Sequence, residues 1–110
     1  MLSLAIKSLS ITIALAATSQ PALACGFYLD RMEELKQLSQ AAIMLAKEQK
    51  AVGDYIGFCN YMAHANSDYR KAISNYESWA ICFGTTNHKG INAEIAQMRN
   101  LLKYNMSLGC

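Results

Sequence analysis

The sequence predicts an all-α protein, a small antiparallel bundle of three helices joined by two disulfide bonds. Pro21 is the only proline of the chain, so residues 25–110 contain none, and uninterrupted helices are favoured there. Apolar residues recur at helical spacing in three stretches, with no alternation of the kind that marks a strand. Four cysteines, an even number, are spread along the same residues.

The first 24 residues have the composition of a signal peptide. Lys7 supplies a positive charge, residues 11–17 form a short apolar run, and residues 22–24 read Ala-Leu-Ala, a small-x-small cleavage pattern. A membrane-spanning helix needs about 20 apolar residues, so an uncleaved anchor is the weaker alternative. We expect cleavage after Ala24 and one periplasmic or secreted domain, residues 25–110, with no membrane span; the short leader and its cleavage pattern favour a bacterial protein.

Cleavage at this position would make Cys25 the first residue of the mature protein, as in bacterial lipoproteins. A lipoprotein signal usually has leucine three positions before that cysteine, where this chain has Ala22. A lipid on Cys25 would also leave three cysteines, an odd number, in an oxidising compartment. We therefore expect Cys25 to form a disulfide, with a lipoprotein anchored through Cys25 as the alternative.

The first helix of the mature protein is predicted over residues 30–52. Asp30 and Glu33 have the spacing of a capping box, which favours a helix start. Gly53 is suited to end this helix and Asp54 to cap the next one. The expected buried face has a three-four spacing and consists of Leu35, Leu38, Ala42, Leu45 and Val52.

The second helix, predicted over residues 55–83, has the clearest pattern of the chain. Its heptad stripe extends over four repeats, as in antiparallel helices that cross near 20°. The positions seven residues apart are Tyr55, Met62, Tyr69, Tyr76 and Phe83, and those between them are Phe58, Ala65, Ala72 and Trp79. Residues 66–68 (Asn-Ser-Asp) favour a break, which would make a four-helix protein. Because the heptad phase continues through them, we expect one continuous helix.

Residues 84–90 (GTTNHKG) are predicted to form a loop, and the third helix is predicted over residues 91–107. Gly and polar residues dominate the loop, whereas apolar periodicity resumes directly after it. The expected buried face of this helix is Ile91, Ile95, Met98, Leu102 and Asn105.

Helix geometry selects one of the three ways to pair four cysteines. Cys59 and Cys82 lie 23 residues apart on one helix, roughly 34 Å along its axis, whereas a disulfide needs Cα atoms within about 7 Å. Counting from the two turns, Cys25 and Cys82 reach one end of an antiparallel bundle, and Cys59 and Cys110 reach the other. We predict the pairs Cys25–Cys82 and Cys59–Cys110.

The sequence offers little catalytic or metal-binding chemistry. His64 lies five residues after Cys59, but a nucleophilic cysteine needs a free thiol. His88 lies in the predicted loop, and no CxxC motif is present to suggest a zinc site. Glu33 and Glu34 are adjacent and diverge on a helix. We expect no catalytic residue, no metal and no cofactor.

Charge gives no reason to expect a nucleic-acid partner. The whole chain has a formal net charge of +2, and without Lys7 it has nine Lys and Arg against eight Asp and Glu. Tyrosine is favoured at protein interfaces because it combines contact area with a polar tip. Tyr28, Tyr61 and Tyr104 lie off the heptad stripe or at helix ends, so we treat them as candidate interface residues.

The combination of leader, four cysteines and small helical body resembles periplasmic immunity proteins, which guard bacteria against injected hydrolases. The segment 57–62 (GFCNYM) is the part of the chain that carries the likeness. The same outline is similar to small accessory proteins of conjugation and secretion machines. We expect a non-enzymatic protein that binds a protein partner in the cell envelope, most simply as an inhibitor. An accessory subunit and a carrier of a small hydrophobic ligand are the alternatives.

Overall fold

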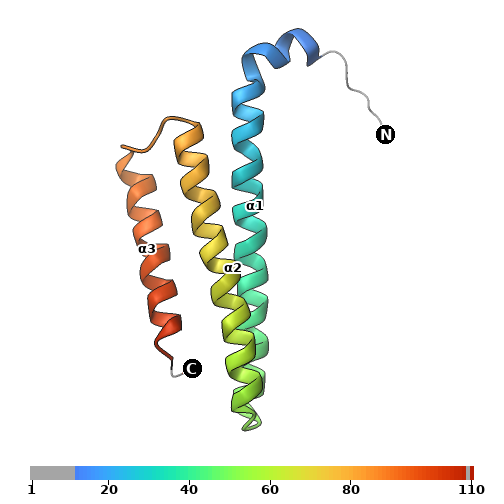
Figure 1. Ribbon diagram of the computed structural model, residues 1–110, viewed down its shortest axis with the longest axis vertical. Helices are drawn as coiled ribbons and strands as arrows, with labels where there is room; N and C mark the ends of the chain where they lie inside the picture. The colour runs from blue at the N-terminus through green and yellow to red at the C-terminus, as the bar shows by residue number, and fades with distance from the viewer. Residues whose placement is uncertain (1–11, 109) are drawn as a thin grey trace.

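The structure is a computed structural model that describes residues 12–108 and 110, with side chains from residue 25 onward except residue 109. Its three helices are α1 (Thr12–Ala51), α2 (Tyr55–Cys82) and α3 (Lys89–Met106), and no strand occurs among the described residues. α2 runs antiparallel to both of its neighbours (Figure 1). The predicted all-α, three-helix fold is therefore confirmed.

α2 is the central helix of the bundle. In Figure 1, α2 lies between α1 and α3 in the upper part of the view and crosses in front of α1 in the lower part, and α2 packs along much of α1. Within the described part of the chain, no residue pair from α1 and α3 has Cα atoms within 8 Å. The bundle is thus open on the side where a closed three-helix bundle would bring its first and third helices together.

α2 begins and ends where the sequence predicts. Asp54 is its N-cap, with the Asp54 carboxylate accepting a hydrogen bond from the Gly57 backbone N–H at 2.8 Å. Gly53 has a φ of 82°, a left-handed conformation that glycine adopts without steric cost. The helix is continuous through residues 66–68, so the four-helix alternative is wrong. The local preference of these polar residues is overridden by packing on both sides of them.

α1 begins earlier than predicted. The helix is continuous through residues 25–33, and Asp30 is an exposed residue inside it rather than its cap. The capping box is therefore wrong, because backbone N–H groups inside a helix already bond to carbonyls one turn earlier. Arg31 instead forms an ion pair with Glu34, three residues later, and its Nη1 atom lies 2.7 Å from the Glu34 Oε1 atom. Of the predicted leader, residues 1–11 lie outside the described part and residues 12–24 belong to α1, and cleavage after Ala24 stays a prediction.

The buried face of α1 also differs from the predicted one. Leu35 is buried, but Leu38, Leu45 and Val52 are exposed. The face that meets α2 has heptad spacing and consists of Met32, Leu35, Ser39, Ala42, Ala46 and Gln49. The small side chains on this face leave room for the large residues of the α2 stripe, and close packing of volumes decides which face turns inward.

The core divides into two clusters along α2. The larger cluster combines residues of all three helices, namely Met32, Leu35, Tyr69, Ala72, Ile73, Tyr76, Ile95 and Met98. The smaller one, nearer the α1–α2 turn, is Ala46, Phe58 and Met62. Between them, the buried Ser39 hydroxyl donates to the Ala65 carbonyl at 2.9 Å, which satisfies a polar group inside the interface. The interior of the predicted heptad stripe is confirmed, whereas Tyr55 and Phe83 at its two ends are exposed.

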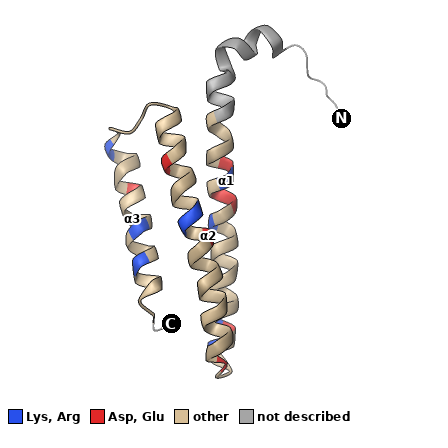
Figure 2. Cartoon of the chain, in the orientation of Figure 1, with Lys and Arg blue, Asp and Glu red and all other residues tan. Residues whose placement is uncertain are grey.

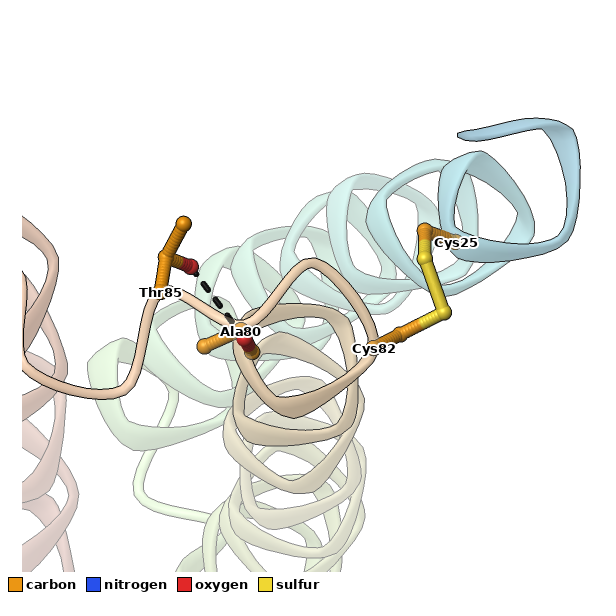
Figure 3. The surroundings of a disulfide bond; sticks show 4 residues. All are labelled: Cys25, Ala80, Cys82 and Thr85. Atoms are coloured by element: carbon orange, nitrogen blue, oxygen red, sulfur yellow. Dashed lines mark hydrogen bonds between the residues drawn. A yellow bond between two sulfur atoms is a disulfide. The ribbon is translucent and has the colours of Figure 1, made fainter. Parts of the chain in front are cut away.

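α3 starts two residues before its predicted beginning. His88 is its N-cap, and the Nδ1 atom of His88 accepts a hydrogen bond from the Ile91 N–H at 3.3 Å. Ile95 and Met98 are buried as predicted, and the other expected face residues are half-buried. In the preceding loop, the Thr85 hydroxyl donates to the Ala80 carbonyl at 3.2 Å, beside the end of α2 (Figure 3).

Both predicted disulfides are confirmed. Cys25 and Cys82 have Cα atoms 5.6 Å apart (Figure 3), and Cys59 and Cys110 have Cα atoms 5.5 Å apart. One disulfide lies near each end of α2, so each end of the central helix is covalently joined to a neighbouring segment. Since the Cys25 sulfur is bonded to Cys82, it has no thiol to carry a lipid in this state. Disulfides are compatible with a periplasmic or extracellular location.

Candidate interaction surfaces

The four cysteines are all disulfide-bonded, which removes the one nucleophile that the sequence suggested. Cys59 is bonded to Cys110, and His64 is an exposed residue one turn further along α2. Among the described residues, no group of three or more His, Cys, Asp and Glu side chains is placed to hold a metal ion. No described helix is long and apolar enough to cross a membrane.

The three tyrosines singled out from the sequence lie on three different helices. Tyr28 is half-buried on α1, with its ring edge-on to Phe27 at a centroid distance of 6.0 Å. Tyr61 is half-buried against the smaller core cluster. Tyr104 is the most exposed of the three and lies on α3. No ring contact in the described part of the chain joins two of them, so they do not form one common surface.

A row of large apolar residues, which we call the α1 edge, is exposed on the first helix. It consists of Leu38 (48 % exposed), Leu45 (41 %) and Val52 (78 %). Leu38, Leu45 and Val52 are seven residues apart and lie one above the other on the helix. Ile56, at the start of α2, is also 78 % exposed.

The α1 edge was not predicted, because Leu38, Leu45 and Val52 were assigned to the buried face of the first helix. Leu35, Leu38 and Leu45 all fit a three-four pattern, so a stripe with the wrong phase looks as apolar as the correct one. A signal was nevertheless present in the sequence. Ser39 and Ala46 follow Met32 at seven-residue intervals, and this row of smaller residues is the one that packs against α2.

A second surface, the α1–α3 groove, is formed because α1 and α3 do not meet. It has a volume of 410 Å³. α1 contributes Ile43, Lys47 and Lys50, α2 contributes Phe58 and Met62, α3 contributes Leu101, Tyr104 and Asn105, and Leu108 follows α3. Tyr104, one of the predicted interface residues, thus lines this groove.

The two surfaces lie on opposite sides of α1. Residues two apart on a helix point about 200° apart, and Ile43 and Lys47 each lie two residues from Leu45. The groove and the α1 edge therefore face different directions. A substitution on one surface leaves the other unchanged, which makes the two surfaces separately testable.

Polar contacts hold α3 to α2 away from the groove. The Tyr76 hydroxyl donates to the Glu94 carboxylate at 2.6 Å, and Arg99 forms an ion pair with Glu77. The pKa of Tyr76 is raised from 10.0 to about 12, first by burial, then by its hydrogen bond to Glu94, and then by the charges of Glu94 and Glu33. Burial and Glu94 also raise the pKa of Tyr69. Both tyrosines are held in their neutral form.

Charges of both signs occur on each of the three helices (Figure 2). This distribution differs from the one-signed stripe that marks nucleic-acid-binding proteins. Comparisons with protein-family models, curated proteins and solved structures found no match to this chain. The proposal that follows therefore rests on the surfaces of the molecule itself.

Proposed function

We propose that this is an exported, non-enzymatic protein that acts by binding another protein, most simply as an inhibitor or immunity-type protein of a hydrolase. The observation that carries the proposal is the α1 edge. A row of Leu and Val residues at seven-residue intervals is the pattern with which a helix inserts into an apolar groove of a partner. Burying one such side chain contributes about 1.5–3 kcal/mol.

Rigidity supports the same proposal. The α1 edge belongs to a helix that packs along α2, and the Cys25–Cys82 disulfide joins these two helices directly. A surface that is already ordered loses less entropy on binding than a flexible one. A protein that blocks an enzyme through one fixed helix face needs this preorganisation.

The test is a site-specific photo-cross-link at Leu45, made in cells of the native host under non-reducing conditions. We expect one stoichiometric product with an envelope hydrolase. The purified protein should then inhibit that hydrolase. The double variant Leu38→Lys/Leu45→Lys should lose the cross-linked partner and weaken inhibition by about 100-fold, since two apolar anchors are replaced by charges.

The matched control carries the same two charge changes at exposed α2 positions, Ala63→Lys and Ser74→Lys. It should bind and inhibit like the original protein. If this control fails as badly as the edge variant, or if neither variant changes binding, the α1 edge is not the binding surface. A cross-link to a subunit of a conjugation or secretion machine would replace the inhibitor proposal by the accessory-subunit one.

A further inference from the structure

The α1–α3 groove has a different chemistry from the α1 edge. Six of its nine lining residues are apolar or aromatic, and the other three are Lys47, Lys50 and Asn105. None of the nine is a carboxylate. An apolar recess with a few polar donors on its wall is the usual composition of a small-molecule site.

Neither groove lysine forms an ion pair with a described residue. The ion pairs in the described part of the chain are Arg31–Glu34 and Glu77–Arg99, so neither groove lysine has a carboxylate oxygen within 4.0 Å. The ammonium of Lys50 lies 5.3 Å from the centre of the Phe58 ring, a cation–π contact over the floor of the groove. Two ammonium groups therefore lie beside an apolar surface, and no carboxylate oxygen of a described residue lies within 4.0 Å of either.

The dimensions of the groove favour a small molecule over a helix. One wall extends over residues 43–50 of α1, which corresponds to about 10 Å along that helix, and the other over residues 101–108, the last turns of α3 and the two residues after it. A volume of 410 Å³ lies within the range of about 300–1,000 Å³ for ligand sites. An α-helix is itself about 10–12 Å wide and would not enter so short a recess.

We infer that the α1–α3 groove binds a single-chain anionic amphiphile of medium length, such as a fatty acid. The acyl chain lies on Ile43, Phe58, Met62, Leu101 and Leu108. The head-group carboxylate lies beside Lys47 and Lys50. This site is independent of the proposed protein partner, because the α1 edge is on the opposite side of α1.

The test uses the purified, disulfide-bonded protein and decanoate as the probe, with decanol as an uncharged molecule of the same chain length. Binding is measured by titration calorimetry below the concentration at which decanoate forms micelles, and located by NMR amide shifts. We expect one saturable site, with shifts concentrated on residues 43–50 and 101–108. Decanol should bind about tenfold more weakly, since it lacks the charge that faces two ammonium groups.

Two variants separate the head-group site from the chain site. Lys47→Glu/Lys50→Glu should weaken decanoate binding by at least about tenfold and leave decanol binding unchanged. Its control, Lys71→Glu/Lys89→Glu, makes the same change of net charge at exposed positions outside the groove and should bind decanoate normally. Leu101→Gln alters an exposed wall residue and should weaken both probes alike, because it removes apolar contact only.

Three results would each overturn the inference. The first is the absence of saturable decanoate binding. The second is equal affinity for decanoate and decanol with no effect of the lysine substitutions. The third is a set of NMR shifts centred on the α1 edge rather than on the groove. None of these depends on whether a protein partner is found, so failure here is distinct from failure of the proposed function.

Discussion

The α1–α2 pair and α3 are held in the same molecule by different means. α2 buries eight residues, from Phe58 to Ala80, whereas α3 buries two, Ile95 and Met98. The paired helices interlock along a heptad seam with small residues on the α1 side. α3 is attached to one neighbour, through a short apolar face, three polar contacts and the Cys59–Cys110 disulfide.

This difference shows how a small domain keeps a helix that it cannot bury well. A narrow apolar face does not by itself offset the entropy lost when a helix of 18 residues is ordered. A covalent bond near the end of α3 lowers that loss by restricting the unfolded chain. The weakly packed end of α3 is also where the α1–α3 groove opens. The recess is thus a consequence of attachment by a disulfide rather than by burial.

Removing the Cys59–Cys110 disulfide should have the largest effect on the difference between α3 and the α1–α2 pair. Its loop spans 51 residues, so Cys59→Ser/Cys110→Ser should cost about 4 kcal/mol in the chain-entropy model. We expect α3 to open locally, because its two buried residues, Ile95 and Met98, lie near its middle and the Arg70–Met106 contact closer to its end is exposed. Amide hydrogen exchange should therefore accelerate across α3 before it does so in α1 and α2.

The matched variant, Cys25→Ser/Cys82→Ser, opens a loop of 57 residues. Its expected loss of stability from chain entropy is nearly the same as for Cys59→Ser/Cys110→Ser. It should leave the exchange protection of α3 unchanged and lower that of α1. Identical exchange patterns for the two variants would show that the helices unfold as one unit.

Substitutions that shorten a buried side chain compare the stability contributed by the α1–α2 interface with that contributed by the α2–α3 interface. Leu35 and Met98 are both nearly inaccessible, at 2 % and 4 % exposure. Leu35→Ala should cost about 3 kcal/mol and Met98→Ala about 2 kcal/mol, because the neighbours of Met98 collapse more easily into the space left behind. Urea unfolding with the disulfides intact measures both values. A larger cost for Met98→Ala would mean that α3 is the better-packed helix.

The Tyr76–Glu94 contact is a smaller and pH-dependent link between α2 and α3. Tyr76→Phe should cost about 1.5 kcal/mol at neutral pH, since it removes a hydrogen bond to a charged group. The folded pKa of Tyr76 is about 12 against 10.0 for an ordinary tyrosine, so the folded state holds this proton more tightly. The contribution is therefore complete below pH 10 and is lost as the pH rises towards 12.

Thermal unfolding between neutral pH and pH 12 measures this effect, with tyrosinate absorbance reporting ionisation. The Tyr76→Phe protein should lose less stability over the alkaline range than the original. Tyr55→Phe is the control, because Tyr55 is exposed, and it should follow the original curve. If all three proteins lose the same amount of stability at high pH, then folding does not raise the pKa of Tyr76.

The smallest effects concern the caps of α2 and α3. Asp54→Ala removes a 2.8 Å carboxylate cap and should cost about 1 kcal/mol. His88→Ala removes a longer imidazole cap of 3.3 Å and should cost about 0.5 kcal/mol. His88→Asp should stabilise α3, because a carboxylate is a better acceptor and favours the helix N-terminus. Thermal shifts of the three variants check this order, which a loss on His88→Asp would contradict.

Features with a local origin were predictable with good accuracy. The heptad stripe of α2 predicted a continuous helix because seven-residue recurrence extends through residues 66–68, and the turn at Gly53 and Asp54 has specific capping chemistry. The disulfide pairing followed from these boundaries alone. Once two turns and two helix lengths are known, an antiparallel arrangement leaves one pairing of four cysteines within reach.

Features that depend on the neighbour of a helix were less predictable. For α1, two overlapping stripes satisfy the helical period, and the sequence analysis chose the one richer in leucine. The start of α1 was misplaced because Asp30 and Glu33 have cap spacing in the middle of a continuous helix. Tyr61 and Tyr104 looked equivalent, yet one packs on a core cluster and the other lines the groove.

The sequence by itself determined the helical class, the central role of α2 and the covalent connections, because these depend on periodicity and on distances along the chain. The tertiary structure alone decided which face of α1 is buried, and hence that Leu38, Leu45 and Val52 are exposed. It also decided that α1 and α3 stay apart and leave a groove between them. Both outcomes depend on how side-chain volumes fit between helices, and no single helix carries that information.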